Sequence, residues 1–353
     1  MPLADDLNRY FEHRTFRTPE PDLNGKVVFV TGGTGSFGQH FVRRVIERYT
    51  PQKLIIFSRD ELKQYDMQMA FPTAKYPFMR YFIGDVRDLA RLEMAMRDVD
   101  YVIHAAALKH VPIAEYNPFE CIQTNVIGAQ NVVTAAMRRG VKQVVALSTD
   151  KAANPINLYG ASKLASDKIF IAANNLSGRD GTRYCVVRYG NVVGSRGSVV
   201  PYFQKLVAEG AAELPITDDR MTRFWITLDQ GVDFVLSSLA LSRGGEVFVP
   251  KIPSMRTVDL ARCIAPQLPQ RIVGIRPGEK LHEVMVPEDD ARSTLDLGDR
   301  YVILPADALE LRAHYLESGG EQTPDGFVYS SDRNGERLDA RALQTLLGLS
   351  LAA

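Results

Sequence analysis

One stretch near the N-terminus constrains the fold more than any other part of the chain. Residues 27–30 form a short apolar run rich in β-branched side chains, as a buried parallel strand requires. A turn with Gly32, Gly35 and Gly38 follows, then a helical pattern and a second apolar strand over residues 54–57. Glycines at this spacing allow a tight turn, a close approach of backbone to a phosphate and close helix packing. The motif therefore predicts a dinucleotide-binding turn, and a purely structural glycine-rich turn is the alternative.

The alternation of strand and helix continues to residue 189. Strands are expected at residues 27–31, 53–58, 79–83, 101–104, 143–148 and 183–189. Helices are expected between them, at residues 36–49, 61–70, 88–96, 118–139 and 158–175. This pattern predicts an α/β fold, a Rossmann-type doubly wound parallel sheet with helices on both faces and ligands at the carboxyl ends of its strands.

The regular alternation is lost after residue 191, where short helices (201–209 and 229–241) are separated by loops rich in Gly, Pro, Asp and Arg. This change predicts a smaller C-terminal lobe that binds the substrate. The predicted division is an N-terminal arm (1–25), a nucleotide-binding Rossmann domain (26–192, with returning elements from about 225–250), mainly the substrate-binding lobe (193–335) and a C-terminal helix (336–353). The sequence leaves open whether the arm packs on the body or on a neighbouring subunit.

Charge and cysteine content exclude several classes of protein. Lys and Arg number 42, as do Asp and Glu, so no net charge favours nucleic acid or an anionic membrane. No apolar run approaches the roughly 20 residues that span a bilayer, and the first residues do not resemble a signal peptide. The three cysteines are far apart and lack CxxC spacing, which argues against disulfides and structural zinc. We expect a reduced cytoplasmic protein without a metal site.

A candidate catalytic group follows the strand that is expected to end at residue 148. Thr149, Asp150 and Lys151 come directly after it, and Tyr159 and Lys163 lie further along. Tyr159 and Lys163 are one helical turn apart, so they share a helix face, and the cation would lower the pKa of the phenol. The group predicts acid–base chemistry. The alternative is a solvated helix pair.

The end of the second strand bears on the nucleotide. An enzyme that uses NAD places a carboxylate there for the ribose hydroxyls, whereas this chain has Ser58 followed by Arg59, with Lys63 nearby. A hydroxyl and a guanidinium suit a 2′-phosphate, so we predict NADP rather than NAD. Asp60 weakens this prediction unless it belongs to the next helix. After the third strand, Asp85 could accept a hydrogen bond from adenine or cap a helix, and both roles stay open.

Taken together, these residues resemble a known family. Similarity to extended short-chain dehydrogenases/reductases that act on nucleotide sugars lies in residues 31–38, 105–107 and 188–191, in Asn125, and in Tyr159 with Lys163. More narrowly, the chain resembles UDP-N-acetylglucosamine 4,6-dehydratases that invert C5, the PseB type that opens the pseudaminic acid pathway, at residues 58–64, 108–112, 148–153, 221–226 and 276–280. The resemblance covers roughly residues 25 to 335. Its most specific part is Asp150-Lys151, because C5-retaining enzymes carry Asp-Glu there.

The resemblance implies a reaction and a role for each residue. Tyr159, helped by Lys163, would take the C4 hydroxyl proton while hydride passes to the nicotinamide. The 4-ketone acidifies C5, so Lys151 could remove the C5 proton and Asp150 could protonate the departing C6 hydroxyl, with Thr149 on the C4 oxygen. These roles need a neutral Lys151 and a neutral Asp150, and we expect a neutral, hydrogen-bonded pair in a dry pocket.

The resemblance also implies binding residues. The predicted cofactor set is Gly32, Thr34, Gly35, Ser36, Phe37, Gly38, Ser58, Arg59, Lys63, Asp85, Val86, Ala105, Ala106, Ala107, Asn125, Tyr159 and Lys163. The predicted substrate set is Lys109, Asn191, Arg223, Arg276 and Glu279, with both arginines on the UDP pyrophosphate and Glu279 on the ribose. Salt bridges between lobes are the alternative for the arginines. Phe224 and Trp225 are expected in the core, and His110 has no predicted role.

Two further hypotheses remain beside the dehydratase. A nucleotide-sugar 4-epimerase would share Tyr159 and Lys163 but would not need the Asp150-Lys151 pair. A non-catalytic nucleotide-binding protein would keep the fold alone. The expected partner is a UDP-sugar substrate, and no nucleic acid or membrane is expected. The resemblance also predicts a homo-oligomer, with a dimer through helices 118–139 and 158–175 that can group into hexamers.

Overall fold

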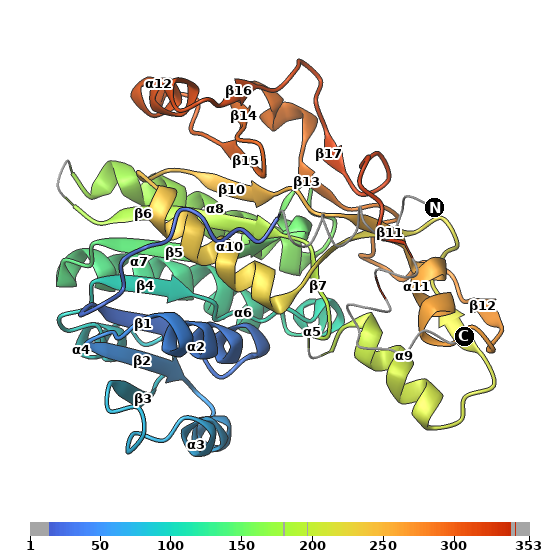
Figure 1. Ribbon diagram of the computed structural model, residues 1–353, viewed down its shortest axis with the longest axis horizontal. Helices are drawn as coiled ribbons and strands as arrows, with labels where there is room; N and C mark the ends of the chain where they lie inside the picture. Colours follow the sequence, from blue (N-terminus) through green and yellow to red (C-terminus); the bar gives the residue numbers. More distant parts are fainter. Residues whose placement is uncertain (1–13, 179–180, 196, 340–342, 344–353) are drawn as a thin grey trace.

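A ten-stranded sheet forms the centre of the described protein, which in this computed structural model comprises residues 14–178, 181–195, 197–339 and 343 (Figure 1). The strands run in the order β16-β14-β15-β10-β6-β5-β4-β1-β2-β3, and the neighbours from β10 to β3 are parallel. Their bounds are β1 Val27–Thr31, β2 Lys53–Ser58, β3 Met79–Ile83, β4 Tyr101–His104, β5 Gln143–Thr149, β6 Arg183–Tyr189, β10 Val247–Pro250, β14 Thr294–Asp296, β15 Arg300–Ile303 and β16 Glu321–Gln322.

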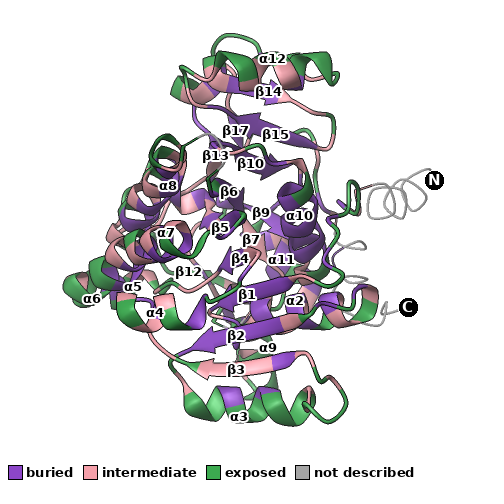
Figure 2. Cartoon of the chain, turned by 90° about the vertical axis from the view of Figure 1, so that its left-hand side faces the viewer, coloured by how far each residue is buried: buried purple, intermediate pink, exposed green. Residues whose placement is uncertain are grey.

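Helices cover both faces of the sheet, as the alternating pattern predicts. Figure 2 shows α4 (Leu89–Ala95), α7 (Gly128–Arg139) and α8 (Leu158–Leu176) on one side, with α2 (Ser36–Arg48) and α10 (Leu228–Leu241) on the other. The central strands are almost wholly buried because apolar helix faces press on them from both sides. The strand order reverses between β1 and β4, and ligands of such sheets bind at this switch point.

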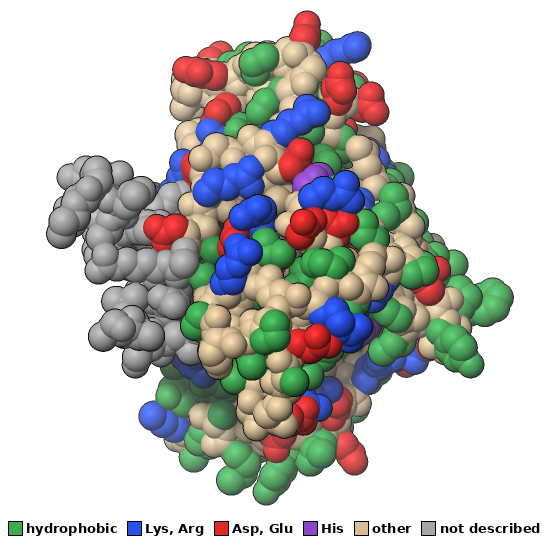
Figure 3. Space-filling view, turned by 90° about the vertical axis from the view of Figure 1, so that its right-hand side faces the viewer, with side chains coloured by type: hydrophobic (Ala, Val, Ile, Leu, Met, Phe, Trp, Pro, Cys, Tyr) green, Lys and Arg blue, Asp and Glu red, His purple; other side chains and the backbone are tan. Residues whose placement is uncertain are grey.

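A second lobe lies beyond the carboxyl ends of the strands, towards the right of Figure 1. Its own apolar core includes Trp225, while Phe224 packs into the main core, so both aromatic side chains are buried as expected. The lobe contains β7 Asn191–Val192, α9 Val199–Ala208, β8 Leu214–Ile216, β9 Thr222–Ile226, β11 Ser254–Arg256, α11 Thr257–Ile264 and β12 Gln270–Ile272. Basic and acidic side chains lie side by side on this face of the molecule (Figure 3).

The C-terminal part of the chain differs from the expectation. Strands β14, β15 and β16 are antiparallel additions to the main sheet next to β10, joined by η3 (Glu288–Ser293) and α12 (Leu309–Glu317). The stretch predicted as mainly substrate lobe therefore also lengthens the Rossmann sheet. A separate pair, β13 (Val284–Val286) with β17 (Tyr329–Ser330), lies between the two parts. Most of the predicted C-terminal helix is outside the described residues, and residues 336–339 are not helical.

The described part of the N-terminal arm packs on the body of its own chain. Phe16 is buried against Phe234 of α10, with ring centroids 5.0 Å apart, and the Arg14 side chain donates to the Lys251 carbonyl. Ser237 of α10 donates to the carbonyl of Thr18. The arm therefore closes one side of the α10 helix.

The expected helix at residues 118–139 is divided by a wider turn. It comprises α6 (Pro118–Ile122), the π-helical segment η1 (Gln123–Ile127) and α7. A short helix, α5 (Val111–Tyr116), precedes it and was not predicted. The expected helix at residues 61–70 is α3 (Glu61–Ala70). Within the described residues, none of the helices is both long and apolar enough to cross a lipid bilayer.

Candidate active site

A cavity of about 870 Å³ lies at the carboxyl ends of the parallel strands, between the sheet and the second lobe. All five predicted substrate residues line it, as do all the predicted cofactor residues except Gly38 and Asn125. Thr149, Lys151, Tyr159 and Lys163 line it too, whereas Asp150 is fully buried behind Lys151. The fold thus brings the predicted residues into one place.

The glycine-rich turn fits a phosphate group. Gly32 has φ +64°, and a Cβ there would lie 2.8 Å from the backbone nitrogen of Ala106. Helix α2 begins after Gly35 with no side-chain cap and no acidic residue in its first turn, so its free N–H groups are available to an anion. Gly38 serves packing instead, because its Cβ would meet the Gly33 carbonyl oxygen at 2.2 Å.

The end of β2 presents two cations to the cavity. Arg59 is about half exposed and lies 3.5 Å from the Asp85 carboxylate, and Lys63 lies 2.8 Å from Asp60. Asp60 caps α3 by accepting from the backbone N–H of Lys63, so its carboxylate is engaged at the start of the helix. Ser58 is buried and accepts from Gln64. The strand end therefore carries a guanidinium where an NAD enzyme has a carboxylate.

The question left open for Asp85 has a structural answer. Asp88, not Asp85, caps α4. Asp85 lines the cavity and accepts from the backbone N–H and the guanidinium of Arg87. Burial raises the pKa of Asp85, but hydrogen bonds from Arg87 and the charge of Arg59 outweigh burial and hold the pKa below its ordinary value.

Asn125 positions the loop after β4 rather than lining the cavity. Its side chain accepts from the Leu108 N–H at 2.8 Å and donates to the Leu108 carbonyl at 2.9 Å and to Ser162 at 2.9 Å. The wide turn of η1 carries this side chain. The expectation that Asn125 touches the cofactor is corrected to an indirect role, through the loop that bears Ala105, Ala106 and Ala107.

The Asp150-Lys151 pair sits on a tight 3-10 turn, η2 (Asp150–Ala152), directly after β5. Lys151 Nζ lies 3.0 Å from Asp150 Oδ1, and Thr149 donates to that same oxygen at 2.8 Å. Helix α8 presses against this turn at Gly160, where a Cβ would lie 2.2 Å from the Lys151 carbonyl oxygen. Only a glycine lets α8 bring Tyr159 this close.

The surroundings of Lys151 favour its charged form, which argues against the expected neutral side chain. Burial lowers the pKa of Lys151, but the carboxylates of Asp150 and Glu283 outweigh burial and raise it above its ordinary value. Glu283 Oε1 lies 3.5 Å from Lys151 Nζ. Lys151 Nζ therefore lies between two acidic side chains, of which the sequence analysis considered only Asp150.

The electrostatics of Tyr159 also differ from the expectation. Burial raises the pKa of the phenol to about 12, and the charge that lowers it belongs to Lys151, with a hydrogen bond from Thr149 acting in the same direction. Lys163 donates to the Leu147 carbonyl at 2.7 Å, and burial lowers its pKa. The two side chains share a face of α8 as predicted, but the predicted lowering of the phenol pKa by Lys163 is not found.

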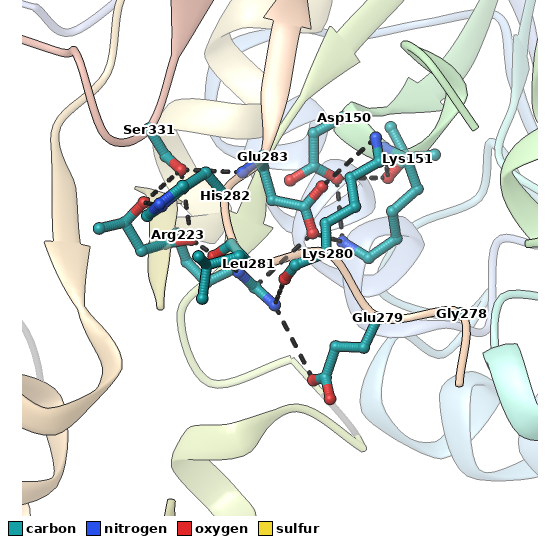
Figure 4. A network of polar contacts seen from close by, with 12 residues as sticks. Asp150, Lys151, Arg223, Gly278, Glu279, Lys280, Leu281, His282, Glu283 and Ser331 are labelled. Carbon is teal, nitrogen blue, oxygen red and sulfur yellow. Dashed lines mark hydrogen bonds and ion pairs between the residues drawn. The ribbon is translucent and has the colours of Figure 1, made fainter. Parts of the chain in front are cut away.

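The substrate side of the cavity is built on the loop between β12 and β13, residues 273–283 (Figure 4). Arg223 is buried and donates to the carbonyls of Thr222, Lys280 and Leu281. Arg276 is exposed and forms a two-bond ion pair with Glu279. Arg223 thus holds the loop, a structural role similar to the salt bridge between lobes that was the alternative for the two arginines. Arg276 keeps its guanidinium at the surface of the cavity.

The comparisons with known proteins agree with this geometry. A family model described as "Polysaccharide biosynthesis protein" matches residues 28–305. A UDP-N-acetylglucosamine 4,6-dehydratase (inverting) of Campylobacter jejuni subsp. jejuni serotype O:2 is 59% identical over 317 residues, which cover 88% of this chain and 94% of the relative. The chain belongs to this family of extended short-chain dehydrogenases/reductases. The resemblance predicted from the motif residues is confirmed.

Other members of the family differ in their named activity. A UDP-glucose 4-epimerase of Rickettsia canadensis is 42% identical over 330 residues, covering 91% of this chain and 95% of the relative. Among solved structures, Pen from Bacillus thuringiensis has a TM-score of 0.84 and 33% identity, covering 92% of this chain and 98% of that one. DesIV, a dTDP-glucose 4,6-dehydratase from Streptomyces venezuelae with NAD and TYD bound, has a TM-score of 0.66 and 26% identity, covering 83% and 98%. These structures confirm the predicted α/β Rossmann-type fold.

Proposed function

We propose that this protein is a lyase, a 4,6-dehydratase that acts on UDP-N-acetylglucosamine and inverts C5. The product is UDP-2-acetamido-2,6-dideoxy-β-L-arabino-hex-4-ulose. The single observation that carries the proposal is the pair of Lys151 and Asp150, 3.0 Å apart, beside Tyr159 in the cavity. The named activity of the Campylobacter relative, at 59% identity, supports it.

The chain's own residues supply the proton chemistry. The glycine-rich turn and the N-terminus of α2 would hold the phosphates of a nicotinamide dinucleotide, which when bound would accept the C4 hydride and return it to C6. Tyr159 takes the proton of the C4 hydroxyl, and Lys151 takes the C5 proton once C4 is a ketone. Asp150 protonates the departing C6 hydroxyl. Tyr159 then returns its proton to C5 from the opposite face, which inverts the centre.

The cofactor is NADP rather than NAD in this proposal. Arg59 at the end of β2 offers a guanidinium to a 2′-phosphate, and Asp60 is occupied as the cap of α3. The related DesIV structure contains bound NAD. The choice between the two nucleotides therefore rests on Arg59 and Lys63.

A second candidate is a nucleotide-sugar 4-epimerase, which the 42% identical Rickettsia relative favours. Such an enzyme needs Tyr159 and Lys163 to form and reduce the ketone. It has no step for Asp150 and Lys151, whereas the dehydratase uses both side chains of this pair, of which Lys151 lines the cavity.

One incubation separates these functions. Pure protein is mixed with UDP-N-acetylglucosamine in heavy water, and the product is followed by mass spectrometry and NMR. The dehydratase predicts loss of one water and deuterium at an inverted C5. An epimerised product of unchanged composition would indicate the second candidate, and a D-xylo product formed first would contradict the inversion.

A further inference from the structure

Glu283 is a buried carboxylate that lies against Lys151, and no sequence motif pointed to it. It is 2% exposed and still lines the cavity. Its Oε1 lies 3.5 Å from Lys151 Nζ and 3.6 Å from Arg223 Nε, and its Oε2 lies 3.8 Å from Lys280 Nζ (Figure 4). Oε2 has no hydrogen-bond partner among the described residues. A buried, incompletely bonded carboxylate is costly, so its presence beside the base calls for a reason.

The backbone of Glu283 is held firmly. Its N–H donates to the Ser331 side chain at 2.9 Å, and its carbonyl accepts from the Ser331 N–H at 2.8 Å. Two residues along the chain, the Met285 carbonyl accepts from buried Arg188. The backbone that carries this carboxylate is therefore held by the fold itself, and electrostatic stabilisation requires such a preorganised charge.

The positions of the protons during the elimination show which charge this carboxylate can stabilise. When Asp150 carries the proton that it gives to the C6 hydroxyl, it is neutral. At that moment Lys151 takes the C5 proton, the electrons of the C5–H bond form the C5=C6 bond, and the C6–O bond breaks. A positive charge forms on Lys151 Nζ, and Glu283 is the remaining carboxylate of the described network that faces it.

We propose that Glu283 is a positioning residue whose fixed negative charge stabilises the ammonium that forms on Lys151 as this side chain removes the C5 proton. The inference rests on the proposed function. Its role parallels that of a buried aspartate that stabilises an imidazolium in hydrolases. Asp150 supplies the acid and Glu283 the counter-charge, so the two carboxylates have separate tasks.

The test is the rate of deuterium incorporation at C5 in heavy water with UDP-N-acetylglucosamine. In Glu283→Gln, which keeps size and loses charge, we expect incorporation and kcat to fall about 100-fold, with KM little changed. In Glu283→Asp the side chain is one methylene shorter, so the negative charge lies further from Lys151 Nζ. We expect the rate of deuterium incorporation to fall about tenfold. Wild-type incorporation in either variant would overturn the proposal, so Glu283→Asp decides the matter even if Glu283→Gln does not fold.

The pH profile gives a readout that a merely structural role would not move. The pair of Asp150 and Lys151 must share one proton, and it loses that proton when the pH exceeds the pKa of Lys151. Glu283 raises that pKa, so the alkaline limb of the exchange rate should move to lower pH in Glu283→Gln. The other charged or titratable groups that act on Lys151, which stay in place, are Asp150, Arg223, Lys280, Lys109 and Tyr159.

Glu246→Gln is the matched control. Glu246 is equally buried, but it bonds to Ser242 and Tyr315 away from the cavity. The Glu246→Gln variant should have a lower Tm, and its exchange rate and pH profile should be those of the wild type. An equal loss of exchange in Glu246→Gln would overturn the proposal, because general destabilisation would then explain both variants.

If wild-type protein releases no water from UDP-N-acetylglucosamine, the proposed function itself fails, which is a different result from normal exchange in Glu283→Gln.

Discussion

In the proposed mechanism Lys151 and Asp150 have separate roles in the elimination, and each can be substituted without the other. Lys151→Ala removes the base, so C5 exchange and product formation should fall by about 10²–10⁴-fold. Asp150→Asn keeps the base but cannot donate to the C6 hydroxyl, so water loss should stop while some C5 exchange persists. NMR of the sugar in heavy water measures both. Equal loss of exchange in the two variants would contradict this division of roles.

Arg59 tests the choice of nucleotide at the same scale. Its guanidinium is half exposed at the end of β2 and is the closest match to a 2′-phosphate partner. Arg59→Ala should weaken NADP binding by about 10–100-fold, as expected for a charge-assisted contact, and should change NAD binding little. Calorimetric titration with each nucleotide gives the two constants, and equal losses would refute the NADP assignment.

Individual site residues were predictable where a motif fixes backbone geometry. The glycine-rich turn and the Tyr159–Lys163 spacing are local, so the sequence placed them on the cavity wall. Glu283 was not predictable, because 132 residues separate it from Lys151 and only the fold brings them together. The same long-range charge raises the pKa of Lys151, an effect that the expected neutral pair did not take into account.

At the scale of elements, the contact of α8 with η2 can be tested by adding a single methyl group to Gly160. In Gly160→Ala the new methyl group meets the Lys151 carbonyl, and such overpacking costs about 1–3 kcal/mol of unfolding free energy. Activity should fall as well, because Tyr159 and Lys151 are pushed apart. Gly231→Ala, within α10, has open space and should stabilise the protein by about 0.4–1 kcal/mol. Denaturant unfolding compares the two, and equal stability would show that the contact is not tight.

Long apolar strands were predictable, and short ones were not. Strands β1, β2, β5 and β6 carry buried apolar runs, so their positions follow from the sequence pattern alone. Strands β14 and β16 have three and two residues, and β16 is defined by its pairing with β14, from which β15 and α12 separate it in the chain. The π-helical turn at η1 was not predicted, because its residues continue a helical pattern and the wider turn appears only in the backbone hydrogen bonds.

At the scale of the whole molecule, exposed apolar side chains support the predicted oligomer. Ile113 and Tyr116 of α5 and Phe119 of α6 are 52%, 88% and 81% exposed, at the edge of the molecule in Figure 2. Light scattering at micromolar concentration should give a dimer or hexamer, and Phe119→Asp should shift it towards monomer. Leu309→Asp, equally exposed on α12 at the far end of the sheet, should not. A wild-type monomer would contradict the prediction.

One amide side chain joins the two halves of the cavity. Asn157 caps α8 by accepting from the Gly160 N–H at 2.7 Å and donates to the Gly278 carbonyl of the 273–283 loop at 2.7 Å. Ordering either partner lowers the entropy that the other must lose, so the nucleotide and the sugar should tighten each other's binding by the same factor. Titrating each ligand with and without the other measures this factor. Asn157→Ala should bring it close to one, so that the two ligands bind independently.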